Sequence, residues 1–110
     1  MNIHEEKDND VTICTLEGEI NINTSPELRK KFTQVIEANE KKVLIDCAGV
    51  SYLDSSGLAT LIEILQRLKK INGKLRFCNI NEKVKNILEI TKLVNLFEIF
   101  ESREEALQGF

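Results

Sequence analysis

Residues 43–68 read VLIDCAGVSYLDSSGLATLIEILQRL, and this stretch decides the fold class. Its first three residues, Val43 to Ile45, form an uninterrupted apolar run, which is typical of a strand covered on both faces, as in a parallel sheet. Its last part, Leu58 to Leu68, repeats leucine and isoleucine at helical spacing and predicts an amphipathic helix with Leu61 and Leu65 buried. A buried strand followed by an apolar helix indicates an α/β protein built from βαβ units.

The segments on either side continue the alternation of strands and helices. Upstream, residues 2–5 and 11–16 read as strands, and Ser25-Pro26-Glu27 predicts a helix start with Ser25 as the capping hydroxyl. Downstream, the expected features are a stop at Asn72-Gly73, strands over 75–78 and 96–100, a short helix opened by Asn81, and a terminal helix with a capping box over 102–105. The order predicts one α/β domain, with a mixed, mostly parallel sheet of four to five strands and about four helices.

Length and composition fit a single globular domain. The chain has 110 residues, of which 42% are hydrophobic and 30% charged, so it is too apolar for a disordered protein. Its apolar runs are too short to span a membrane, and the acidic amino terminus lacks the apolar core of a secretory signal. We therefore expect one cytoplasmic domain over residues 1–110, without membrane insertion.

Charge and cysteine usage argue against several kinds of site. The formal net charge is -3, and the basic pairs are interleaved with glutamate, so direct nucleic-acid binding is not expected. Cys14, Cys47 and Cys78 lack CxxC spacing and lie in apolar stretches, where free cysteine behaves as a small hydrophobe. The sequence thus predicts buried core cysteines, no metal site and no cofactor.

The most informative segment for function is Val50 to Leu58, between the predicted strand and the predicted helix. Ligands and partners of open α/β sheets meet the carboxyl ends of the strands, and a helix start there favours an anion. Ser55 or Ser56 is the helix cap on one interpretation and a functional residue on the other, and the two are compatible.

An enzyme is not predicted from these residues. A serine nucleophile needs a base, and the only histidine, His4, lies in the amino-terminal segment. Neither GxxxxGK[ST] nor GxGxxG occurs, so no standard nucleotide loop is present. The serine can instead receive chemistry from another protein, because a phosphoserine next to Asp54 adds roughly two negative charges to the surface.

Asp54-Ser55-Ser56-Gly57-Leu58, preceded by Val50-Ser51-Tyr52-Leu53, resembles the signature of STAS domains. Within that family it is most similar to the bacterial anti-sigma factor antagonists of sporulation and of the general stress response. The resemblance extends over nearly the whole chain, through residues 16–20, 43–46 and 72–75.

The resemblance implies partner switching. An unphosphorylated antagonist binds an anti-sigma factor and frees a sigma factor. The anti-sigma factor is commonly also a serine-protein kinase that uses ATP and Mg²⁺, and a PP2C-type phosphatase reverses its action. The acceptor is the serine directly after the aspartate, which is Ser55, whereas Ser56 is expected to be committed to the helix start. The partner-binding positions that the resemblance implies are Asn21, Asn23, Thr24, Asp54, Ser55, Ser56 and Gly57.

Two alternatives stay open. The family often has an acidic residue where this chain has Asn21, so Asn21 to Thr24 is either a partner-facing loop or a polar turn before a helix. The protein could also be a STAS subunit of a membrane-associated complex, such as a lipid-transport ABC assembly or a larger signalling particle. A small enzyme or nucleotide binder would need catalytic residues away from Ser55.

Overall fold

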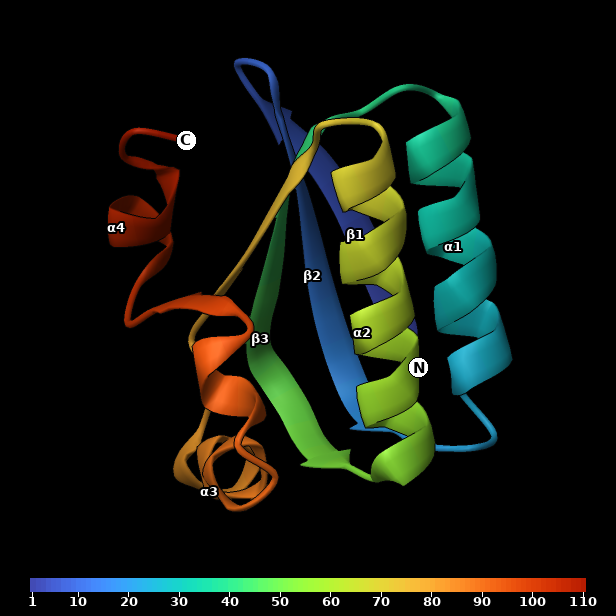
Figure 1. The fold of residues 1–110 in the computed structure, drawn as a ribbon, viewed down its shortest axis with the longest axis vertical. Coiled ribbons are helices and arrows are strands. Elements are labelled where there is room, and N and C mark those ends of the chain that lie inside the picture. Colours follow the sequence, from blue (N-terminus) through green and yellow to red (C-terminus); the bar gives the residue numbers. More distant parts are fainter.

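The computed structural model describes residues 1–110 and contains one five-stranded sheet in the order β1-β2-β3-β4-β5 (Figure 1). β1 runs antiparallel to β2, and every later strand runs parallel to its neighbour, so the predicted mixed, mostly parallel sheet is confirmed. The elements in chain order are β1 (Asn2–Asp8), β2 (Val11–Ile20), α1 (Ser25–Glu37), β3 (Lys42–Leu53), α2 (Ser55–Lys70), β4 (Lys74–Cys78), α3 (Glu82–Ile90), a 3₁₀ turn η1 (Leu93–Asn95), β5 (Glu98–Phe100) and α4 (Arg103–Leu107).

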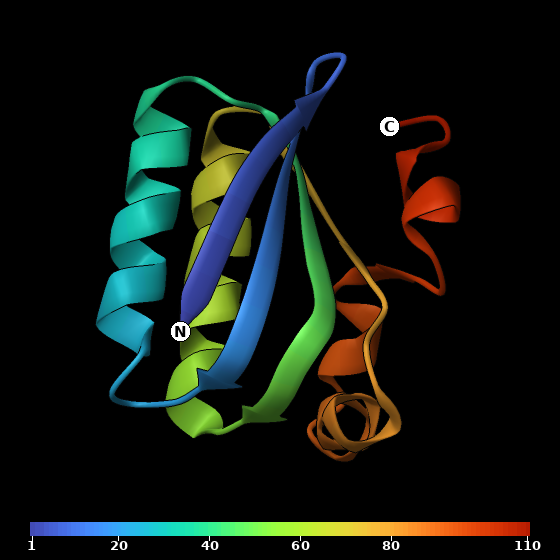
Figure 2. The same ribbon diagram turned by 180° about the vertical axis from the view of Figure 1, so that it is seen from behind.

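The helices are divided between the two faces of the sheet. α1 and α2 lie side by side over one face (Figure 1), whereas from behind no helix crosses β1 and β2 (Figure 2). Val43 and Ile45 belong to the core that includes α1 and α2, and Leu44 packs in a second cluster with Ala106 of α4. Because both faces of β3 are covered, its apolar run is uninterrupted, as the sequence predicts.

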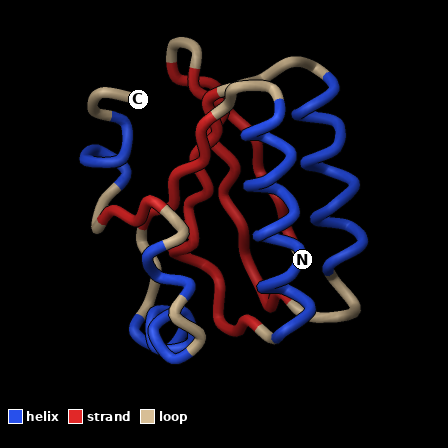
Figure 3. Tube along the Cα trace, in the orientation of Figure 1, coloured by secondary structure: helices blue, strands red, loops and turns tan.

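The strands differ in length from the predictions. β2 continues to Ile20 and β3 to Leu53, so residues 50–53 extend a strand and do not form a loop (Figure 3). The two strands pair in parallel along their length, with shifts in register between Thr15 and Glu17 and between Gly18 and Glu19. β5 is shorter than predicted because Leu96 ends the 3₁₀ turn and Phe97 lies in a bend, so the strand begins at Glu98.

Two of the three caps predicted outside the central stretch are confirmed. Asn81 Oδ1 accepts from Val84 N at 2.8 Å, and Ser102 Oγ accepts from Glu105 N at 3.1 Å. The predicted Ser25 cap is wrong: Thr24 is the N-cap residue, and Ser25 is buried in the first turn with no partner for its hydroxyl. α1 therefore begins one residue before Pro26, without a side-chain cap.

The predicted core around α2 is confirmed. Leu61 and Leu65 are both buried, in the same cluster as Val43 and Ile45. All three cysteines are buried and unpaired, as predicted for core residues. Burial raises the pKa of the Cys14 thiol to about 12 and that of Cys78 to about 11, so both stay protonated at neutral pH. No helix is both long enough and apolar enough to cross a membrane.

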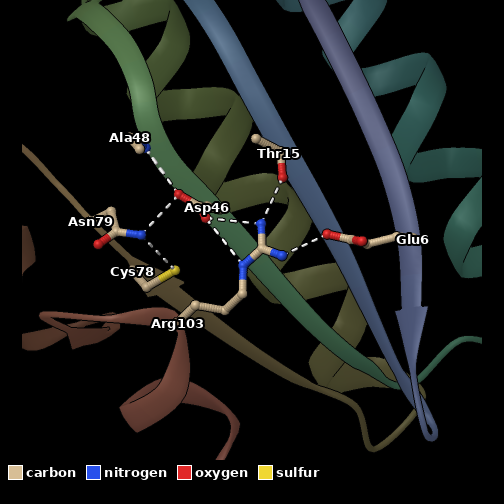
Figure 4. Close-up of polar contacts among 7 residues, drawn as sticks. All are labelled: Glu6, Thr15, Asp46, Ala48, Cys78, Asn79 and Arg103. Atoms are coloured by element: carbon tan, nitrogen blue, oxygen red, sulfur yellow. Dashed lines mark hydrogen bonds and ion pairs between the residues drawn. The ribbon is translucent and has the colours of Figure 1, made fainter.

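A buried carboxylate anchors α4 to the sheet (Figure 4). Asp46 of β3 is 5% exposed, and its Oδ1 accepts from Ala48 N at 3.0 Å and from Asn79 Nδ2 at 3.1 Å. Its Oδ2 accepts from Arg103 of α4, at 3.3 Å from Nε and 3.0 Å from Nη2. Arg103 continues the Asp46–Arg103 network to β2 and β1 through Thr15 Oγ1 and Glu6 Oε1.

Candidate functional site

The start of α2, residues 54–57, is organised by an aspartate. Asp54 is extended and is the N-cap residue, and its Oδ1 accepts from Gly57 N at 2.9 Å. The expectation that Ser55 or Ser56 caps the helix is therefore wrong. β3 reaches Leu53, which leaves Asp54 as the one residue between strand and helix, and its negative charge suits the positive end of the helix dipole.

With Asp54 as the cap, both serines lie inside the first turn. Ser55 is the first helical residue and is exposed, and its side chain makes none of the hydrogen bonds that hold the helix start. Ser56 is half-buried, and its carbonyl accepts from Thr60 Oγ1 at 3.0 Å. Of the two hydroxyls, that of Ser55 is the more accessible to another protein.

The loop between β2 and α1, residues 21–24, lies directly against the start of α2. Ile22 N donates to Asp54 Oδ2 at 3.3 Å, and Asp54 N donates to Ile20 O at 3.1 Å. Both segments lie at the same end of the molecule, below the carboxyl ends of β2 and β3 in Figure 1. We call the two segments, 21–24 and 54–57, the loop–helix site. The fold thus brings together all seven positions singled out in the sequence.

The side chains of Asn21 and Thr24 form hydrogen bonds with the backbone of the loop and of the residue Glu19 before it. Asn21 Oδ1 accepts from Asn23 N at 2.9 Å and from Thr24 N at 3.1 Å. Thr24 Oγ1 accepts from Asn21 N at 2.9 Å and donates to Glu19 O at 2.8 Å. These two side chains build the turn. Ile22 is not among the predicted site residues, although an aliphatic residue between two asparagines is itself a signal.

Gly57 lets the helix approach the sheet. A Cβ at this position would lie 2.6 Å from Ile20 O and 2.6 Å from Leu53 Cδ1, closer than any van der Waals contact allows. Because one of these atoms belongs to the backbone, the helix start would have to move away from β2 to accept a side chain. Glycine at 57 therefore sets the position of Ser55 relative to the loop.

Gly57→Ala is expected to lower the free energy of unfolding by about 1–3 kcal/mol, because overpacking displaces the start of α2. Urea denaturation of the two proteins measures this change. Ser55→Ala is the matched control in the same turn, and it should be nearly neutral because Asp54, not Ser55, caps the helix. Equal stability of Gly57→Ala and the natural protein would show that the backbone adjusts without cost.

The Asp54 carboxylate is committed to the backbone, and the one histidine lies in another element. Both Asp54 oxygens accept backbone N–H groups, and His4 lies in β1, paired with Thr15 of β2. No group of three or more His, Cys, Asp and Glu side chains is placed to hold a metal ion. The arrangement offers an exposed hydroxyl at a helix start, beside a carboxylate and a structured loop.

Comparison with known proteins identifies the family. The family model described as the STAS domain matches residues 2–106. An anti-sigma-B factor antagonist of Bacillus subtilis is 30% identical over 111 aligned positions, which cover 98% of this chain and 100% of that protein. The crystal structure of an anti-sigma factor antagonist from Mycobacterium paratuberculosis has a TM-score of 0.87 at 24% identity, covering 96% of this chain and 90% of that chain.

A further similar structure is that of the Bacillus cell fate determinant SpoIIAA in its phosphorylated form. Its TM-score is 0.73 at 18% identity, over 96% of each chain. The mixed sheet and the arrangement of the helices agree with these matches. The chain therefore belongs to the STAS domain family, and several of the proteins similar to it are named anti-sigma factor antagonists.

Proposed function

We propose that residues 1–110 act as one domain, an anti-sigma factor antagonist that binds an anti-sigma factor through the loop–helix site and thereby releases a sigma factor. The observation that carries the proposal is the exposed Ser55 at the start of α2, directly after Asp54, whose carboxylate binds the loop. The Bacillus subtilis relative, matched over its whole length, bears the name of such an antagonist.

Phosphorylation of Ser55 switches the complex off. The anti-sigma factor acts as the kinase and transfers the γ-phosphoryl group of ATP to Ser55 Oγ. The new O–P bond replaces the bond to ADP, and the hydroxyl proton leaves to a base of the kinase. A PP2C-type phosphatase returns the serine with water and releases inorganic phosphate. SpoIIAA, a protein of the same fold, is known in a phosphorylated form, which supports a switch by phosphorylation.

The switch is electrostatic and leaves the fold in place. A phosphate on Ser55 lies at the positive end of the α2 dipole, which tolerates negative charge. It also lies next to Asp54, so the helix start presents roughly three negative charges where it presented one. A partner surface that closes over this site must desolvate or oppose those charges, and like-charge juxtaposition costs several kcal/mol.

Ser55→Asp should therefore weaken binding of the anti-sigma factor at least tenfold, with little change in melting temperature. Aspartate carries less charge than phosphoserine, so its block can be partial. Ser55→Asn, of nearly the same shape without the charge, is the matched control and should bind much more tightly than Ser55→Asp. Calorimetric titration with anti-sigma factors encoded in the same genome, together with thermal melting, measures both.

Two results would contradict the proposal. One is equal affinity of Ser55→Asp and the natural protein. The other is phosphate mapped by mass spectrometry to Ser56 alone after incubation with the kinase and ATP, since Ser56 is half-buried in the first turn of α2.

A further inference from the structure

We infer that Ile22 is the apolar anchor of the loop–helix site, a side chain that enters an apolar pocket of the partner directly beside Ser55. The inference rests on the proposed function for the identity of that partner, the anti-sigma factor. It assigns to Ile22 the recognition that the sequence assigned to the polar residues around it.

The polar side chains of the loop are directed at the loop itself. Asn21 and Thr24 direct their side-chain oxygens to the N–H groups of the loop itself, and the Thr24 hydroxyl also donates to the carbonyl of Glu19. Both side chains are partly buried. A partner that formed hydrogen bonds with these two side chains would have to break the turn, so their role is to support the loop. The residues of the loop that are exposed to a partner are Ile22 and Asn23.

Ile22, in contrast, is exposed on a structured loop. Its side chain is 69% exposed, although isoleucine is among the residues most often buried. The loop is bonded at residues 21, 22, 23 and 24, so Ile22 is held in place before any partner arrives. A preorganised loop backbone loses little conformational entropy on binding, so more of the free energy gained by burying the Ile22 side chain contributes to affinity.

Exposure by itself does not distinguish Ile22, because isolated hydrophobic residues are normal on protein surfaces. Ile90, the last residue of α3, is 80% exposed. What sets Ile22 apart is the bond from its own backbone N–H to Asp54 Oδ2, while Oδ1 of the same carboxylate caps α2 at Gly57. The Asp54 carboxylate thus binds both the loop, at Ile22, and the first turn of α2, which contains Ser55.

This connection defines the partner's chemistry. A partner surface centred on Ser55 can extend over Ile22, because the backbone N–H of Ile22 donates to the carboxylate of Asp54, the residue before Ser55. The partner must therefore offer an apolar pocket for a β-branched side chain next to a polar group that meets the serine. An aliphatic contact of this kind, fully desolvated near the centre of an interface, is typical of a residue that dominates affinity.

The test compares two substitutions of the same type at two exposed isoleucines. Ile22→Asn should weaken binding of the unphosphorylated protein to the anti-sigma factor by about 10- to 100-fold. Ile90→Asn should leave the affinity within about twofold, because its side chain belongs to a different element. Ile22→Val, which keeps the β-branched shape, should restore affinity to within about threefold of the natural protein. All three variants should have the same melting temperature as the natural protein.

The outcomes separate this inference from the proposed function. If Ile22→Asn binds as tightly as the natural protein while Ser55→Asp does not, Ile22 is no anchor and the proposed switch stands. If Ile22→Asn and Ile90→Asn weaken binding equally, the loss is a general one and the anchor is again overturned. If the natural protein binds no anti-sigma factor, the proposed function fails, and the anchor with it.

Discussion

Replacing Leu61 with alanine is expected to lower the free energy of unfolding by about 2–5 kcal/mol. Leu61 lies in the middle of α2, is 4% exposed, and shares an apolar pocket wall with Ile20 and Leu53. The substitution removes three buried carbons and leaves a cavity between α2 and the sheet that the neighbours refill only in part. A small domain is stable by only about 5–15 kcal/mol, so this is a large fraction of the total.

Urea denaturation followed by circular dichroism measures the effect. Leu96→Ala is the matched control: it makes the same chemical change at a side chain that is 42% exposed, and it should change the stability by no more than about 0.5 kcal/mol. Equal losses at the two positions would show that α2 does not depend on Leu61 for its packing. The loop–helix site also rests on this packing, because Ile20 and Leu53 directly precede its two segments.

Asp46→Ala is expected to cost about 3 kcal/mol and to loosen the contact of α4 with the sheet. The substitution removes the acceptor for Arg103, Asn79 and Ala48 N at a position that is itself buried. The cost stays at the lower end of the range for buried pairs because the Arg103 side chain reaches solvent and keeps its contact with Glu6.

Glu6→Ala removes the exposed end of the same network and provides the control. The Glu6 carboxylate is solvent-accessible, so its loss should cost about 0–1 kcal/mol. Denaturation gives the free energies, and hydrogen exchange at Ala106 and Leu107 reports whether α4 detaches. If Asp46→Ala and Glu6→Ala have equal effects, or if exchange in α4 is unchanged, the Asp46–Arg103 network does not hold the helix.

The predictions that succeeded depend on neighbours close in sequence. The apolar run Val43 to Ile45, the helical stripe of α2 and the caps at Asn81 and Ser102 are each encoded within a few residues. Periodicity and capping chemistry are local, so these features can be identified without the fold. The alternation of the segments then determined the fold class, and the DSSGL run at residues 54–58 indicated the family.

The errors around the start of α2 arose where two distant segments meet. β2 and β3 continue past their predicted ends because each pairs with the other, and this pairing makes Asp54 the cap in place of a serine. Arg103 and Asp46 are 57 positions apart, and nothing local in either segment indicates that they form an ion pair.

The loop–helix site shows the same division. The sequence by itself determined which residues are present at the site, including a serine directly after an aspartate. Only the tertiary structure decided that Asn21 and Thr24 turn inward and that Ile22 turns outward beside Asp54. The physical reason is that hydrogen-bond partners are assigned by the order and register of strands, which bring Ile20 and Leu53 side by side across 33 positions of chain.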